Sequence, residues 1–220
     1  MHGINHKIET ALAKGVDEIP EGDLASLRLK ARDCHACDLW RHATQTVFGV
    51  GPADARIMLI GEQPGLYEDR EGVPFVGPAG RLLDRALAEA RLERAQLYLT
   101  NTVKHFKYET RGKVRLHKRA NAAEQAACRM WLAAELARVK PKVIVALGAM
   151  AAQTLFGDAF RVTRERGRWQ RLAADAMGFA TWHPSAILRA PDERREELYR
   201  ELVQDLSTIK QRHDKRSPGT

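Results

Sequence analysis

The stretch Arg56–Gly80, RIMLIGEQPGLYEDREGVPFVGPAG, decides the fold, because the pattern of a buried strand runs directly into a polar loop rich in glycine. The apolar run at 57–60 is unbroken, as expected of a parallel strand covered on both faces. Glu62 and Gln63 follow at the carboxyl end of that strand, the edge at which open α/β sheets bind ligands. The stretch therefore predicts a site at this edge. An ordinary strand-to-helix connection, with Glu62 only capping backbone amides, fits the local pattern equally well.

The same order of strand and helix recurs along the chain. Gly77-Pro78 opens a helix whose apolar residues keep helical spacing to Ala90, and proline is tolerated in a first turn. Further strands are expected at 97–100, 143–148, 168–172 and 179–182. Because alternating strands and helices build parallel sheets, we predict an α/β fold: a three-layer α/β/α sandwich with a central, mainly parallel four-stranded sheet. Its strands should end at Gly61, Asn101, Gly148 and His183.

The remaining helices are predicted from their start signals. Short helices are expected at 8–13 and at 24–31, the second after the N-cap candidate Asp23. Asn121 and Glu124 resemble a capping box before a longer helix. A terminal amphipathic helix is expected at 193–209, followed by a charged, mobile tail at 210–220.

Length, charge and cysteine content limit the class of protein. A chain of 220 residues buries one substantial core, so we read 1–220 as a single domain. The formal net charge of +8 favours a polyanionic partner, nucleic acid before membrane, although a merely soluble basic surface also explains it. No apolar run approaches a membrane span and 1–14 lacks the apolar core of a signal peptide, so we expect a cytoplasmic protein that binds no membrane. Three cysteines fit thiols or metal ligands better than a disulfide framework.

Residues 103–120 form an unusual segment. They show no hydrophobic periodicity and outnumber most connections within a compact domain, and such loops are usually functional or disordered. From 104 to 119 the segment carries seven basic residues against one acidic residue, Glu109. This pattern predicts an arm that seeks phosphates, with a solvated charged flap as the alternative.

A second chemical signal is Cys34-His35-Ala36-Cys37 at the end of a predicted helix. This spacing brings two thiolates to one centre, which suits zinc, an iron-sulfur cluster or a redox pair. Alone, the motif does not choose among them.

Five short motifs follow one another along the chain: Gly61-Glu62-Gln63-Pro64-Gly65, Glu68-Asp69, Pro74-Phe75-Val76-Gly77-Pro78-Ala79-Gly80, Thr100-Asn101 and His183-Pro184-Ser185. Each is weak support by itself, but the ordered set, spread over roughly 34–188, is highly specific. It resembles the iron-sulfur uracil-DNA glycosylases. The resemblance implies a monomeric enzyme that excises uracil from DNA, with single-stranded DNA preferred.

Within that family, the long basic loop carrying His117 is similar to that of the X-type members, which become covalently trapped on the DNA. Their loop motif reads Lys-Arg-Arg-Ile-His, whereas this chain has Lys113-Val114-Arg115-Leu116-His117. Val114 in place of arginine puts one phosphate contact in doubt, while the histidine is kept. The resemblance implies that His117 bonds to the sugar C1' and that four flanking residues bind DNA phosphates: Lys113, Arg115, Lys118 and Arg119.

The resemblance also assigns the uracil pocket. Phe75 would stack on an extruded uracil, and Asn101 would read its O4 and N3 edge and reject cytosine, whose pattern is reversed. Gly61 and Gln63 would add backbone or amide contacts. A buried phenylalanine and a structural asparagine are the plain alternatives.

Cleavage of the C1'–N1 bond develops a cationic sugar and an anionic base, so it needs a negative group and a hydrogen-bond donor. Glu62 and His183 would supply these two groups, and Ser185 would contact a phosphate. A histidine that only shapes the proline turn is the alternative for His183.

Cys34, Cys37 and Cys128 occupy cysteine positions of the family, and His105 stands where turnover members carry a fourth cysteine. The resemblance therefore implies a 4Fe-4S cluster, although three thiolates and an imidazole would by themselves favour zinc. His35 and His42 are rival fourth ligands. Two other functions stay open: a turnover glycosylase with the same pocket, and a non-catalytic, zinc-stabilised nucleic-acid-binding protein.

Overall fold

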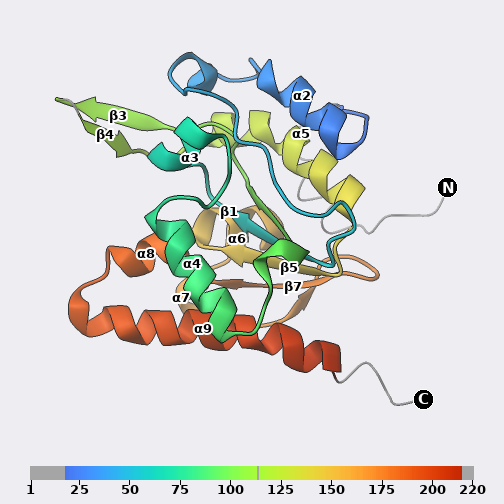
Figure 1. Cartoon of the computed structure of the whole chain (residues 1–220), viewed down its shortest axis with the longest axis vertical. Helices are drawn as coiled ribbons and strands as arrows, with labels where there is room; N and C mark the ends of the chain where they lie inside the picture. Colours follow the sequence, from blue (N-terminus) through green and yellow to red (C-terminus); the bar gives the residue numbers. More distant parts are fainter. Residues whose placement is uncertain (1–17, 113, 215–220) are drawn as a thin grey trace.

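The computed structural model describes residues 18–112 and 114–214 (Figure 1). The helix expected at 8–13, Lys113 and the last residues of the charged tail lie outside this part of the chain. The helices and strands, in order, are α2 (Leu24–Arg32), η1 (Asp38–Arg41), β1 (Ile57–Gly61), α3 (Leu66–Glu71), α4 (Pro78–Glu89), η2 (Arg94–Gln96), β2 (Leu97–Asn101), β3 (Tyr108–Arg111), β4 (Val114–His117), α5 (Ala122–Val139), β5 (Val143–Leu147), α6 (Ala149–Phe156), α7 (Val162–Glu165), β6 (Gln170–Arg171), β7 (Met177–Thr181), α8 (Pro184–Leu188) and α9 (Asp192–Asp214).

The central sheet has the strand order β2-β1-β5-β7-β6. The first four strands are parallel, as predicted, and β6 adds a two-residue antiparallel edge to β7. The mainly parallel sheet is thus confirmed. It has five strands rather than four, and the fifth, β6, lies within the strand expected at 168–172. In the register of β1 and β2, Gly61 lies opposite Asn101, so the polar residues that follow the two strands share one edge.

Helices cover both faces of the sheet (Figure 1). Helices α5, α6 and α7 pack on one face, and α4, α8 and α9 pack on the other. Side chains alternate between the faces of a strand, so Met58 and Ile60 join the first core while Leu59 joins the second. This two-sided burial explains the unbroken apolar run of β1 and confirms the sandwich.

The predicted start signals act as caps. The Asp23 carboxylate accepts a hydrogen bond from the Ser26 amide at 2.7 Å, and Asn121 and Glu124 form a reciprocal capping box. At the other end of the chain the prediction was wrong for Lys210–Asp214, which extend α9 rather than belong to the tail. No glycine or proline lies between Ile209 and Pro218, so nothing stops the helix at 209.

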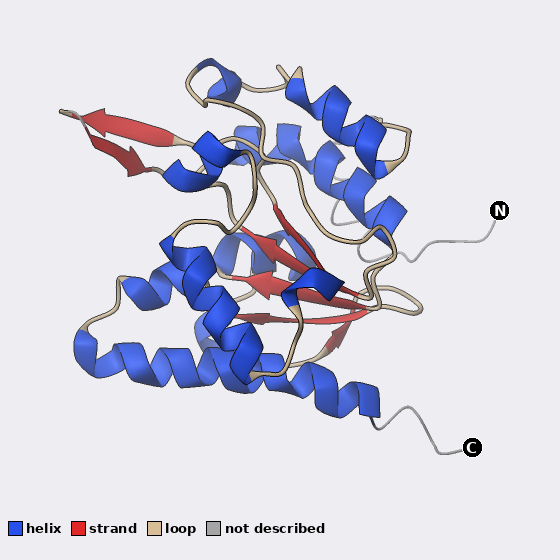
Figure 2. Cartoon of the chain, viewed as in Figure 1, coloured by secondary structure: helices blue, strands red, loops and turns tan. Residues whose placement is uncertain are grey.

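The segment 103–120 is more ordered than the sequence indicated. Strands β3 and β4 form an antiparallel hairpin that projects from the body (Figure 2), with Tyr108 opposite His117. The turn contains Gly112 at a φ of 61°, a left-handed conformation that favours glycine. Both strands are largely exposed, so no apolar face marked them as strands. Within residues 18–112 and 114–214, no helix is long and apolar enough to cross a membrane.

Candidate active site

Three of the residues predicted to recognise uracil meet at the carboxyl end of β1. A Cβ added to Gly61 would lie 2.3 Å from Asn101 Oδ1 and 2.7 Å from Phe75 Cζ. Both side chains therefore lie directly against the glycine, where only a hydrogen fits. The site places an aromatic ring and an amide together, as stacking on a base and reading its edge require.

Phe75 is held in an unusual backbone conformation. Its φ is 59° and the residue is 5% exposed. The buried Glu68 carboxylate fixes the loop around it by accepting hydrogen bonds from the amides of Gly65 at 3.0 Å and Gly77 at 2.8 Å. Arg94 donates to the Phe75 carbonyl at 3.2 Å. Sequence reasoning marked Glu68 only as part of a motif and missed Arg94, which lies outside every motif.

His183 is poised as a neutral hydrogen-bond donor. The Ser185 amide donates to His183 Nδ1 at 3.1 Å, so the ring proton of the neutral form resides on Nε2. Burial, with the positive charge of Arg189 and the neighbouring His117, lowers the pKa of His183 to about 4. The Ser185 hydroxyl lies 2.8 Å from the same nitrogen, so this predicted phosphate contact also orients the ring. The ring centroids of His183 and Phe75 are 6.2 Å apart.

The hairpin brings His117 to the same edge of the sheet as Glu62. Partial desolvation lowers the pKa of His117, the charge of Glu62 partly offsets that shift, and the charge of Arg189 adds to it. The ring is therefore neutral at pH 7, and the residue is exposed to solvent. Arg189, at the carboxyl end of α8, acts on both histidines and was not singled out in the sequence.

Gln63 joins the loop of Glu62 to the base of the hairpin. Its side-chain Nε2 donates to the carbonyls of Lys107 and Lys118 at 3.1 Å each, just before β3 and just after β4. Its Oε1 is buried and has no hydrogen-bond partner among the described residues. A contact between Gln63 and uracil stays a prediction, and the side chain clearly helps to place the hairpin beside Glu62.

Much of the basic charge of 104–119 is neutralised within the protein. Lys107 pairs with Glu124 at 2.7 Å and Lys118 with Glu109 at 3.2 Å. Arg115 lies 3.6 Å from the buried Asp69 carboxylate, and its guanidinium stands over the Tyr108 ring. Arg119 donates to the uncharged Gln153 at 3.1 Å, a contact that orients the guanidinium and keeps its charge. Because these contacts hold the hairpin in place, the charge left for phosphates is smaller than the sequence indicated.

The three cysteines gather in a third core between α2, η1 and α5. Trp131 Nε1 donates to Cys34 Sγ at 3.1 Å, and the Lys104 amide donates to Cys128 Sγ at 3.2 Å. Burial raises the pKa of the Cys128 thiol to about 12. Cys37 completes the group at its half-buried rim.

His105 lies beside this core with an unused lone pair. The Thr46 hydroxyl donates its proton to the Ala31 carbonyl at 2.7 Å, so it accepts from His105 Nε2 at 2.9 Å. His105 Nδ1 is then unprotonated, and it is buried without a partner in the part of the chain described. Among those residues, no three or more His, Cys, Asp or Glu side chains lie close enough together to bind a single metal ion.

The rival ligands are engaged differently. The His35 ring packs on Trp40 with centroids 4.1 Å apart, and His42 contributes its carbonyl to the Tyr108 hydroxyl at 3.1 Å. Both are exposed, whereas His105 is buried.

Comparison with known proteins agrees with this geometry. Residues 48–207 match the family model described as the uracil DNA glycosylase superfamily. The chain belongs to this superfamily. It is 36% identical to a Type-4 uracil-DNA glycosylase of Thermotoga maritima over 182 residues, which cover 82% of this chain and 90% of the relative. A Type-4 uracil-DNA glycosylase of Sulfurisphaera tokodaii is 35% identical over 78% of this chain and 79% of the relative. That of Archaeoglobus fulgidus is 35% identical over 74% of this chain and 82% of the relative.

The superfamily match contains the pocket, the hairpin and His183, and it ends within α9. Cys34 and Cys37 precede the matched range, whereas Cys128 falls inside it. The superfamily match thus covers the residues of the pocket and does not reach the Cys34–Cys37 segment.

Proposed function

We propose that this protein is a uracil-DNA glycosylase that forms a covalent bond between His117 and the abasic sugar that it creates. The observation that carries the proposal is the meeting of Phe75, Asn101 and a neutral His183 at the edge of the sheet that also bears Glu62 and His117. The Type-4 relatives support the excision reaction, and the histidine-bearing hairpin supports the covalent step.

Excision follows from the charges of the site. When the C1'–N1 bond breaks, the electron pair leaves with uracil, and His183 Nε2–H donates to the oxygen that becomes negative. The Glu62 carboxylate stabilises the positive charge left on the sugar. Phe75 and Asn101 hold the extruded base. Extrusion costs least from a single strand, where no base pair is broken, so we expect single-stranded DNA to be preferred.

The covalent step uses the lone pair of His117. The neutral imidazole forms a bond between one ring nitrogen and C1', and its other nitrogen then gives up a proton to Glu62 or water. The resulting neutral adduct has a poor leaving group, so it persists and the protein acts once. The hairpin contacts of Gln63 and Arg115 keep the ring at the sugar.

The cysteine core fits a 4Fe-4S cluster. Cys34, Cys37, Cys128 and Nδ1 of His105 would hold it, because three sulfurs gather there and the lone pair of a buried histidine lacks a partner. N–H donors to Cys34 and Cys128 are typical of cluster thiolates. Ligands of a cluster bind different irons and need not converge on one point, as zinc ligands must. When bound, the cluster ties Cys34–Cys37 to the hairpin side of the protein.

The test is denaturing electrophoresis after incubation with single-stranded DNA containing one uracil. Wild type should give a band shifted by the mass of the protein that survives boiling in detergent, and His117→Ala should lack it. Glu62→Ala should still bind DNA, but it should form both the adduct and the abasic product much more slowly than wild type does. Many turnovers by wild type without a shifted band would replace trapping by ordinary turnover. Tightly bound zinc without iron, and no excision, would leave only a nucleic-acid-binding role.

A further inference from the structure

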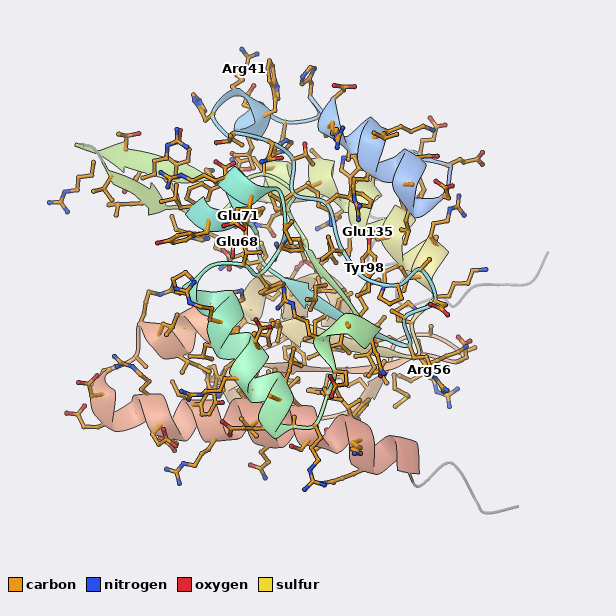
Figure 3. All side chains as sticks on the ribbon, in the orientation of Figure 1. Arg41, Arg56, Glu68, Glu71, Tyr98 and Glu135 are labelled. Carbon is orange, nitrogen blue, oxygen red and sulfur yellow. The ribbon has the colours of Figure 1, made fainter. Side chains whose placement is uncertain are left out.

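Lys104 and Glu135 form an ion pair in the interior of the protein. Both side chains are 0% exposed, and Lys104 Nζ lies 2.6 Å from Glu135 Oε2. Figure 3 shows Glu135 on α5 next to Tyr98 on β2, and the Tyr98 hydroxyl donates to Glu135 Oε1 at 3.2 Å. Neither charge lies at the exposed surface where DNA would be met, so the pair needs another explanation.

The ammonium group has an acceptor for each of its three protons. Besides Glu135, Lys104 Nζ donates to Thr100 Oγ1 at 2.7 Å and to the Asn101 carbonyl at 2.7 Å. Glu135 in turn accepts from the Gly49 amide at 2.8 Å and from the Thr100 hydroxyl at 2.9 Å. The network is closed, and one of its bonds ends on the peptide of the residue that we expect to read uracil.

The Asn101 carbonyl needs this donor because β2 is an edge strand. On the outer side of β2, Leu99 exchanges two hydrogen bonds with Val50, at 2.8 and 2.9 Å. Every second residue of a strand directs its carbonyl to the same side, so that of Asn101 points outward beyond Val50. The Lys104 ammonium supplies the donor that a neighbouring strand would otherwise provide.

Stability alone does not explain two buried charges. A buried ion pair replaced by apolar residues of similar volume often leaves a protein equally stable. An apolar pair would fill the volume but would give the Asn101 carbonyl no donor. The pair therefore adds a fixed orientation of the Asn101 peptide, and through it of the side chain that lies against Gly61.

We propose that Lys104, held by Glu135, is a positioning residue for base recognition. It fixes the Asn101 peptide so that the side-chain amide meets the edge of uracil in one orientation. This inference rests on the proposed function, because it concerns how the same pocket discriminates its base.

The experiment uses the full chain with Lys104→Met/Glu135→Leu, which removes both charges together and leaves the Lys104 amide at Cys128. Free uracil is the probe, and its inhibition constant against excision is measured along with the Tm. Leu132→Ala is the matched control, since it removes buried volume from the same helix and keeps every donor and acceptor of the network. The double variant should lose about tenfold in affinity for uracil, as expected for one misaligned recognition contact. The control should keep its affinity even at an equal loss of Tm.

Three outcomes overturn the inference and leave the proposed function standing. The first is a double variant that binds uracil within twofold of wild type, and the second is a control that loses as much affinity as the double variant. The third outcome concerns Glu135→Gln, which keeps the shape of the network and is used if the double variant does not fold. This variant is expected to lose about threefold in affinity for uracil, from weaker alignment of one contact. Unchanged affinity for uracil in Glu135→Gln would overturn the inference. A wild type that neither excises nor binds uracil overturns the proposed function instead, and this inference with it.

Discussion

Substitution Gly61→Ala tests the pocket with a single methyl group. The added Cβ would lie 2.3 Å from Asn101 Oδ1 and 2.7 Å from Phe75 Cζ, both well inside the 3.4 Å at which ordinary van der Waals contact begins. Gly61 does not have a positive φ, so alanine strains no backbone there. Whatever the variant loses therefore comes from displacing Asn101 and Phe75.

The magnitude follows from that displacement. Overpacking a buried site costs about 1–3 kcal/mol, which for a chain of this size lowers the Tm by about 3–10 °C. The effect on rate is larger, because misplacing a positioning group by about 1 Å costs on the order of a hundredfold. We expect excision to fall about a hundredfold in a protein that stays folded at 25 °C.

The assay is single-turnover release of uracil from a labelled single-stranded oligonucleotide, with the Tm measured on the same preparation. Gly157→Ala is the control, because its methyl group meets nothing within 4 Å while its φ of 102° strains the backbone. The control should lose stability and keep its excision rate. Excision by Gly61→Ala within threefold of wild type would refute the placement of the pocket.

Three further predictions concern the hairpin and His183. Gln63→Ala should remove two hydrogen bonds that together contribute about 1–3 kcal/mol to hairpin docking. The amount of DNA trapped on the protein should fall several-fold on gels, while uracil release persists. Equal losses of trapping and of uracil release would make Gln63 a uracil contact instead. The double variant Arg111→Ala/Arg119→Ala should reduce the slope of log affinity against log salt concentration for single-stranded DNA by about 1.4. Lys107→Ala should barely change that slope, because Lys107 is paired with Glu124. Equal changes of slope in the two variants would contradict the Lys107–Glu124 ion pair. The folded-state pKa of His183, about 4, lies below its unfolded value, so the unfolded chain binds the extra proton and stability should fall by about 3 kcal/mol between pH 7 and pH 4. Measured by urea unfolding, the free energy of unfolding of His183→Gln should depend less on pH than that of wild type. Identical pH dependence in the two proteins would show that His183 does not cause the loss of stability.

The sequence predicted the sheet well because its central strands are buried on both faces. The runs at 57–60 and 143–147 have no polar side, as expected of a parallel strand covered on both faces, and they are too short for a buried helix. Strand ends differed by one or two residues, since β5 ends at Leu147 and β7 at Thr181. The pocket followed from those ends, because parallel strands bring their carboxyl termini to one edge.

Contacts between distant polar residues could not be predicted in the same way. Glu135 falls on an amphipathic helix and Lys104 in a charged segment, and both patterns indicate exposure to solvent. Their burial depends on the meeting of α5 with the edge of β2, a tertiary contact with no periodic signal. The hairpin was missed for the opposite reason, because strands without a buried face lack the alternation that identifies a strand.

That exposed hairpin has a consequence for how the protein can change over generations. None of its strand residues belongs to any of the three cores. Polar contacts such as those of Gln63 and Arg115, and the rings of Tyr108 and His117 against the buried Phe106, attach it to the body. Mutations and length changes between Tyr108 and His117 therefore leave the interior packing intact. The covalent step that we propose for His117 can therefore be gained, lost or retuned in this segment while the central sheet stays the same.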